Sequence, residues 1–78
     1  MKNVVGKRVR EARRLSVPRL TQATLARRLQ ILNWRINRVG IAKIESGIRQ
    51  VTDIELLLLS KALSVDVQWL LEGEYDAG

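Results

Sequence analysis

Residues 20–47 read LTQATLARRLQILNWRINRVGIAKIESG and contain two helical patterns in succession. The first follows Thr21, a good N-cap because its hydroxyl can accept a free backbone N–H of the next turn. Four apolar residues behind this cap recur at helical spacing and form one stripe: Leu25, Ala26, Leu29 and Leu32. Asn33 then favours a helix end. We therefore predict a helix that begins after the cap and ends near this asparagine.

The second pattern follows Asn37, which is also a suitable cap residue. Ile41 and Ile44 lie three residues apart and would face the same side of a helix. Gly47 suits the position just after a helix end, because glycine adopts the left-handed conformation found there without steric cost. The sequence therefore predicts a second helix, which the chain reaches through residues 33–36.

A further helix is predicted before this stretch, over roughly residues 3–15. Val5, Val9 and Ala12 recur there at i, i+4 and i+7, the spacing of one helical face. The helix should end before Pro18, because proline disfavours helical conformation in the residue that precedes it.

Two more helices are predicted after the central stretch. Thr52 and Glu55 match a capping box, in which the two side chains satisfy each other's free backbone N–H groups. The helix behind it should run to about Leu63, with a buried stripe of Ile54, Leu57, Leu58 and Ala62. A short last helix should be capped by Asp66 and closed by Gly73, and its apolar residues are Val67, Leu70 and Leu71. The sequence thus predicts an all-α chain of five helices, a single domain over 3–73 and a frayed tail over 74–78.

The chain contains neither cysteine nor histidine. Disulfides, thiolate nucleophiles, Cys/His zinc sites and the commonest general base are therefore excluded. The eight carboxylates follow no EF-hand spacing, and no glycine-rich phosphate loop is found. We expect no enzyme, no metal, no cofactor and no small-molecule ligand.

No membrane segment is expected. The longest apolar run, Ile54–Leu59, is interrupted by Glu55 and is too short to cross a bilayer, and no secretory signal opens the chain. We expect a cytoplasmic protein. Peripheral membrane binding through the basic helix over 3–15 is an alternative, although its apolar face lacks the Trp or Phe of a good interfacial anchor.

Charge is distributed unevenly along the chain. Residues 1–49 contain thirteen Lys and Arg but only two acids, Glu11 and Glu45. Residues 50–78 contain Lys61 against six acids. A basic first part suggests a face for a polyanion such as nucleic acid. A solvated arginine-rich surface with no partner is equally consistent with the charge alone.

Short segments within about Val5–Gly73 resemble the Cro/repressor (XRE-type) helix-turn-helix family. They are Val9–Arg13, Leu20–Gln22, Leu25–Ala26, Leu29, Ile41–Gly47, and Lys61–Leu63 through Trp69–Leu71. Three features differ from the usual family pattern. The connection Ser16–Arg19 is longer, residues 30–36 exceed the usual tight turn, and Gly40 stands near the start of the recognition helix, where glycine costs about 1 kcal/mol relative to alanine. The resemblance therefore indicates a subgroup with a lengthened turn between the second and third helices.

The resemblance implies a five-helix, lambda-repressor-like fold that binds double-stranded DNA in a sequence-specific manner. It implies a prokaryotic or phage transcriptional regulator, a repressor rather than an activator. The family places the N-terminal residues of its recognition helix against base edges in the major groove. The matching positions here are Arg38, Val39, Ala42 and Lys43. Arg38 could then bind guanine, and Val39 or Ala42 could contact a thymine methyl.

Further roles follow from the same resemblance. Phosphate contacts are implied at four positions: Gln22, Asn37, Arg49 and Gln50. The family pairs an arginine near the end of its first helix with the glutamate that closes the recognition helix, and the matching residues are Arg13 and Glu45. The family commonly forms a homodimer on DNA, and the candidate contacts are Trp69, Leu70 and Leu71, with core packing of Trp69 equally open. Trp34 is expected to pack on the preceding helix as a lid rather than to contact a base.

A protein-interaction module of the same fold, antitoxin-like or coactivator-like, is the alternative function. The lengthened turn and the acidic second part of the chain favour it.

Overall fold

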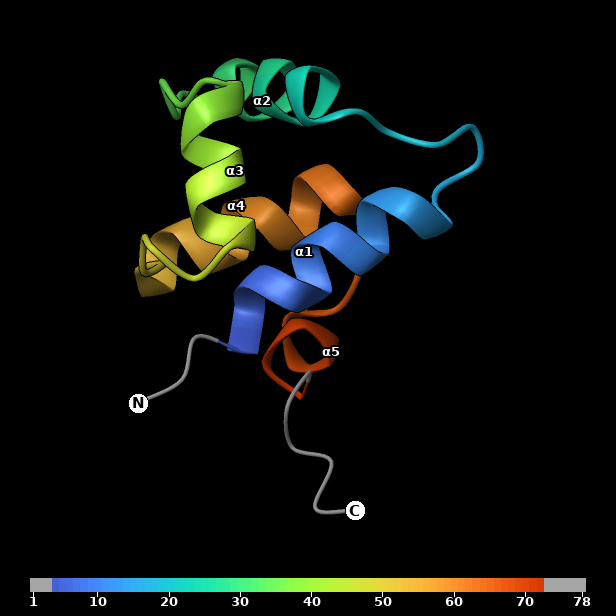
Figure 1. The fold of residues 1–78 in the computed structure, drawn as a ribbon, viewed down its shortest axis with the longest axis vertical. Coiled ribbons are helices and arrows are strands. Elements are labelled where there is room, and N and C mark those ends of the chain that lie inside the picture. The colour runs from blue at the N-terminus through green and yellow to red at the C-terminus, as the bar shows by residue number, and fades with distance from the viewer. Residues whose placement is uncertain (1–3, 73–78) are drawn as a thin grey trace.

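The structure, a computed structural model, describes residues 4–72, and over this range it consists of five α-helices and no strands (Figure 1). They are α1 (Val4–Leu15), α2 (Gln22–Ile31), α3 (Arg38–Glu45), α4 (Asp53–Leu63) and α5 (Val67–Leu71). α2 lies across one end of the molecule, α5 lies at the other end, and α3 runs from α2 towards α1. The predicted all-α architecture of five helices is confirmed for the described residues. The predicted start of the first helix at residue 3, the closing Gly73 and the frayed tail over 74–78 lie outside them.

Three of the four predicted side-chain caps are present. Thr21 and Asn37 each accept a hydrogen bond from the backbone N–H three residues further on, both at 3.0 Å. Thr52 and Glu55 form the complete capping box, with bonds of 3.1 and 3.2 Å. Asp66 occupies the N-cap position of α5, but its side chain makes no capping hydrogen bond. The cap residues in the sequence therefore predicted the starts of α2, α3 and α4 correctly.

An aliphatic core joins all five helices. Its largest fully buried side chains are Val9 from α1, Leu25 and Leu29 from α2, Ile41 and Ile44 from α3, Leu59 from α4 and Leu70 from α5. The stripes predicted for α1 and α3 are buried, whereas Leu32, just beyond α2, is only partly buried.

The buried stripe predicted for α4 is correct at Ala62 but wrong at the other three positions. Ile54 and Leu57 are 73% and 48% exposed, and Leu58 is only partly buried. The residues that α4 buries are Leu59, Ala62 and Leu63. Four consecutive leucines at 56–59, spaced about 100° apart around a helix, surround most of its circumference, so the spacing did not identify a single apolar face.

The segment after α2 returns the chain to α3 through a compact turn. Asn33 takes the left-handed conformation with φ +71°, in line with its predicted role at the helix end. The backbone N–H of Trp34 donates to the Leu29 carbonyl at 3.0 Å, and the Gln30 side chain donates to the Ile36 carbonyl at 2.8 Å. The first bond uses a carbonyl in the last turn of α2, which the end of a helix leaves free, and the second ties the segment before α3 to α2.

Glycine at position 40 has a packing function. A Cβ atom there would lie 2.6 Å from Cγ1 of Ile36, closer than real contacts allow. Ile36 is buried, and it can cover the first turn of α3 because residue 40 has no side chain. The loss of helix propensity at Gly40 is therefore accompanied by a contact that holds the turn between α2 and α3 against the first turn of α3.

Gly6 permits an even closer approach, between α1 and the end of α3. A Cβ atom on Gly6 would lie 2.1 Å from the carbonyl oxygen of Ile44 and 3.2 Å from that of Glu45. Both neighbours are backbone atoms, which cannot rotate away as a side chain can. The absence of a side chain at residue 6 therefore sets the distance between α1 and α3.

Candidate nucleic-acid interface

Glu45, the last residue of α3, is bound by side chains from two other helices. Its own side chain is fully buried. Arg13 of α1 donates to it in a bidentate manner, with Nε 2.7 Å from Oε2 and Nη2 2.8 Å from Oε1. Gln22 of α2 donates to Oε1 at 3.1 Å, and Arg10 lies 3.5 Å from the same oxygen. One carboxylate thus joins α1, α2 and α3.

These contacts keep the Glu45 carboxylate charged. Burial by itself raises the pKa of Glu45, but the hydrogen bonds from Arg13 and Gln22, the positive charge of Arg13 and the hydrogen bond from Arg10 together lower the pKa below its ordinary value. The hydrogen bond to Glu45 likewise raises the pKa of Arg13 above its ordinary value, against the opposing effect of burial. Arg13 also donates through Nη1 to the Leu20 carbonyl at 3.0 Å, which ties the start of α2 to α1. The angle between α2 and α3 is therefore fixed by a paired, buried charge.

The opposite side of α3 is open to solvent. Arg38, Val39 and Lys43 are exposed there, and Ala42 is partly buried beside them. The four residues predicted to meet base edges therefore include three that are exposed. Asn37, at the start of the helix, is exposed and uses Oδ1 for its cap, so its side-chain N–H groups are not needed for the cap.

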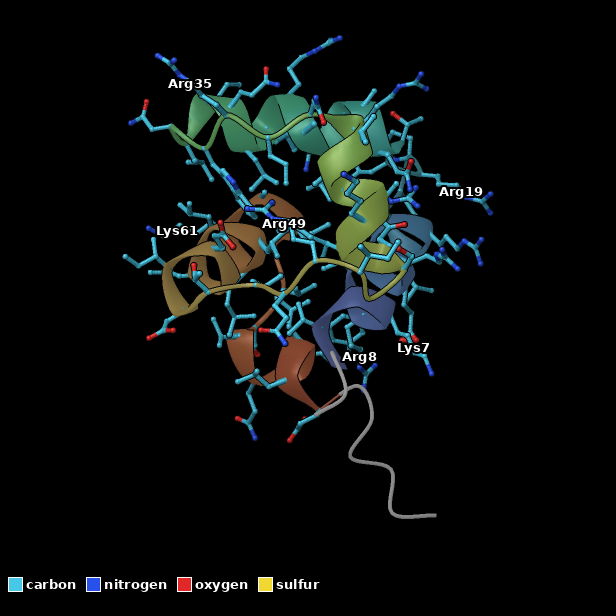
Figure 2. All side chains as sticks on the ribbon, turned by 60° about the vertical axis from the view of Figure 1, so that its left-hand side comes forward. Lys7, Arg8, Arg19, Arg35, Arg49 and Lys61 are labelled. Carbon is cyan, nitrogen blue, oxygen red and sulfur yellow. The ribbon has the colours of Figure 1, made fainter. Side chains whose placement is uncertain are left out.

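A polar hollow of about 380 Å³ adjoins the start of α3. Its lining includes Trp34 and three cations, Arg35, Lys43 and Arg49. Figure 2 shows Arg35 pointing away from the body near the end of α2, whereas Arg49 lies between α3 and α4. Three positive side chains around one hollow create a positive potential beside the exposed side of α3.

Arg49 is less free than the sequence suggested. Its Nη2 is 2.9 Å from Oε2 of Glu55, and its guanidinium carbon lies 5.4 Å from the centroid of the Trp34 ring. The sequence identified Glu55 only as part of a capping box and Trp34 only as a lid. Trp34 does pack against the core, as expected, and it also positions Arg49 through a cation–π contact. Arg49 and Glu55 lie six positions apart, and no local pattern in the sequence predicted this pair.

A helix-turn-helix family model matches residues 18–70, more than half of the chain. The chain belongs to the XRE-type helix-turn-helix family. Proteins of this family are DNA-binding regulators of transcription, and the five-helix structure agrees with that membership. No curated protein and no solved structure matches the chain. The matched range begins after α1, so Arg13 lies outside it and Glu45 inside.

Two further residues of this helix-turn-helix were predicted to contact phosphate, Gln22 and Gln50, and they differ in exposure and in hydrogen bonding. Gln50 is exposed. Gln22 is only partly buried, but one N–H of its amide already donates to Glu45. No pattern in the sequence predicted this bond, because the two residues are 23 positions apart. Because Gln22 has a second side-chain N–H, its contact with a phosphate stays a prediction, and the structure adds a structural role through Glu45.

The three residues predicted to contact a second copy of the helix-turn-helix chain differ in their burial. Leu70 is 0% exposed and belongs to the core, so the prediction that it contacts a partner is wrong. Trp69 is partly buried, and the Arg8 guanidinium carbon lies 4.2 Å from its ring centroid. Leu71 is 45% exposed. A helix with leucines at 70 and 71 directs only one of them towards its own core, and sequence alone did not show which.

Among the described residues, no helix is long and apolar enough to cross a membrane. In the same part of the chain, no group of three His, Cys, Asp or Glu residues is arranged to hold a metal ion.

Proposed function

We propose that this helix-turn-helix chain is a sequence-specific regulator of transcription in a prokaryote or phage, acting as a repressor that binds double-stranded DNA as a homodimer. One observation carries the proposal. The accessible side of α3 presents Arg38, Val39 and Lys43, while its other side is held by the buried ion pair at Glu45. A rigidly held helix with an accessible cationic face is what recognition in the major groove requires.

Each exposed residue has a chemical role in this proposal. Arg38, in the first turn of α3, donates two hydrogen bonds to O6 and N7 of a guanine. Val39 and Ala42 contact a thymine methyl group. Lys43, one turn further on, reaches either a base edge or a phosphate oxygen.

Backbone contacts surround this face. Gln22 and Asn37 stand at the starts of α2 and α3, where free N–H groups and the helix dipole favour a phosphate. Arg49 and Gln50 follow α3 and contact the phosphates on its other side. Because Arg49 is held by Glu55 and Trp34, it is oriented before DNA binds. The proposal includes no catalysis, cofactor or small-molecule ligand.

Selection of bound sequences from a random duplex library tests the proposal. We expect a palindromic consensus, because operator symmetry follows the symmetry of a protein dimer. On that consensus, Arg38→Ala should weaken binding by about 1–3 kcal/mol and relax the preference at one base position. Arg14→Ala is the matched control, since Arg14 is exposed near the end of α1 and its substitution removes the same charge.

The control should lower affinity slightly and equally for all sequences. An Arg38→Ala protein with an unchanged base preference would remove Arg38 from the recognition residues. If no sequence is enriched above background, the chain is instead a protein-interaction module built on the same fold.

A further inference from the structure

The exposed face of α4 carries apolar side chains that the proposed DNA interface does not use. It contains Ile54 and Leu57, which are 73% and 48% exposed. These two residues lie three positions apart, so they share one side of the helix. Isolated apolar residues on a surface are common, but an apolar stripe along a helix suggests a contact surface. The polar residues around this stripe identify what would cover it.

Charged residues stand at the two ends of the stripe. Asp53 opens α4 and Lys61 lies near its end, and both are exposed. No ion pair found among residues 4–72 involves either of them. Figure 2 shows Lys61 on the side of α4 that faces away from α3. The face therefore carries a negative charge at one end, apolar residues in the middle and a positive charge at the other end.

This order is complementary to itself. Asp53 and Lys61 each lie four residues from Leu57, in opposite directions. If two copies of α4 pack antiparallel about a two-fold axis at Leu57, each Asp53 meets the Lys61 of the other copy. In the same arrangement Leu57 contacts its own counterpart, and Ile54 lies against the apolar centre. A two-fold interface requires this kind of self-complementary surface.

We infer that α4 is the surface through which two copies of this chain associate, packed antiparallel with Leu57 on the two-fold axis. The inference specifies the homodimer of the proposed function and rests on it, and it replaces α5 as the contact. It also leaves the accessible side of α3 open, since Ile54 and Leu57 are not part of that side.

The contact should be weak in free solution. Stable interfaces bury about 1,200–2,000 Å² in total, more than a pair of three-turn helices supplies. DNA that holds two copies on neighbouring half-sites raises their effective concentration and compensates for a small contact. The dimer is therefore expected at high protein concentration and on a palindromic site.

Disulfide crosslinking tests the axis directly, because the chain contains no cysteine. A residue on a two-fold axis lies beside its own copy, so Leu57→Cys should crosslink rapidly under mild oxidation without DNA. Leu71→Cys on α5 is the matched control, since Leu71 is 45% exposed against 48% for Leu57. Arg14→Cys gives the rate of random collision. Leu57→Cys should crosslink at least tenfold faster than both.

Charge reversal supplies an independent readout by sedimentation of the free protein. Lys61→Asp should abolish the concentration-dependent dimer, because like charges would then face each other. Adding Asp53→Lys should restore the dimer, while circular dichroism confirms that each variant is folded.

Two outcomes would overturn the inference. Crosslinking of Leu57→Cys no faster than that of Arg14→Cys would show that α4 is not at the axis. Faster crosslinking of Leu71→Cys would assign the contact to α5. Neither experiment contains DNA, so a failure here leaves the test of the DNA-binding function unaffected.

Discussion

The two sides of α3 differ in every property that matters for its proposed role. The side facing α1 and α2 buries Ile41 and Ile44 and ends in the fully buried carboxylate of Glu45. The opposite side carries Arg38 and Lys43, both exposed. The first side is fixed by backbone contact and paired charge, whereas the second has no such constraint.

This difference separates stability from recognition. Residues on the inner side determine where α3 lies relative to α1 and α2, and a change there should alter folding. Residues on the outer side have few contacts within the protein, and a change there should alter only what α3 binds. A change on one side that produced the effect expected of the other would break this division.

The largest effect is expected at the pair between Arg13 and Glu45. Removing one partner of a buried ion pair costs about 3–5 kcal/mol, because the other charge is left buried without compensation. Glu45→Gln and Arg13→Met should each lower the free energy of unfolding by about this amount. The double variant should lose much less than the sum, since it leaves no isolated charge. Urea denaturation of the wild type and the three variants measures the cycle.

The exposed pair between Arg8 and Glu11 provides a control for that cycle. Its atoms are 2.9 Å apart, as close as many buried pairs, but Glu11 is largely exposed. Glu11→Gln should therefore change the free energy of unfolding by about 0–1 kcal/mol. If the substitutions at Arg13 and Glu45 change the free energy of unfolding additively and by less than about 1 kcal/mol, that pair contributes no more than an exposed surface ion pair.

A smaller loss is expected for Gly6→Ala. The added Cβ would meet the Ile44 carbonyl at 2.1 Å, and α1 and α3 would have to move apart. Overpacking of this kind costs about 1–3 kcal/mol. Gly40→Ala is the matched comparison, because there the contact at 2.6 Å is with the flexible side chain of Ile36. Thermal unfolding should show a larger loss for Gly6→Ala, and equal losses would contradict the backbone contact between α1 and α3.

The smallest effect concerns pH. The pKa of Glu45 is lower in the folded protein than in the unfolded chain, mainly because hydrogen bonds from Arg13 and Gln22 outweigh burial. The stability that follows from this lowering is fully present above the ordinary pKa of a glutamate, about 4.3, and is lost as the pH falls through the lower folded pKa. Denaturation curves of the wild type should therefore show a decline in acid that is reduced in Glu45→Gln. Parallel declines in the two proteins would show that another carboxylate is responsible.

The sequence predicted those parts of the structure that depend on local chemistry. Thr21, Asn37 and Thr52 bond with residues three positions away, so their caps could be read from spacing alone. The exposed face of α4 could not, because four leucines in a row give no preferred side and only contact with the other helices decides it. The contact of Arg13 with Glu45 was predicted from the family resemblance and not from local spacing, since the two residues lie 32 positions apart.

The same difference between local contacts and contacts made by helix packing applies to the candidate nucleic-acid interface. The positions on the accessible side of α3 were predicted, whereas the bond between Gln22 and Glu45 and the placement of Arg49 against Trp34 were not. Both unpredicted contacts join residues whose neighbourhood exists only after the helices have packed. The burial of Leu70 instead of Leu71 has the same origin, because two adjacent leucines on a short helix are distinguished only by how that helix docks.

The place of α1 has a consequence for how this protein can be shortened or transplanted. The family match covers residues 18–70, yet both arginines that neutralise Glu45 and the glycine against which α3 rests lie before residue 16. A fragment cut at the boundary of the match would retain the proposed recognition residues, and it would retain the carboxylate of Glu45 without the two arginines that neutralise it. The smallest fragment expected to fold with α3 correctly held is therefore longer than the segment that the family model matches. A graft into another protein must include α1.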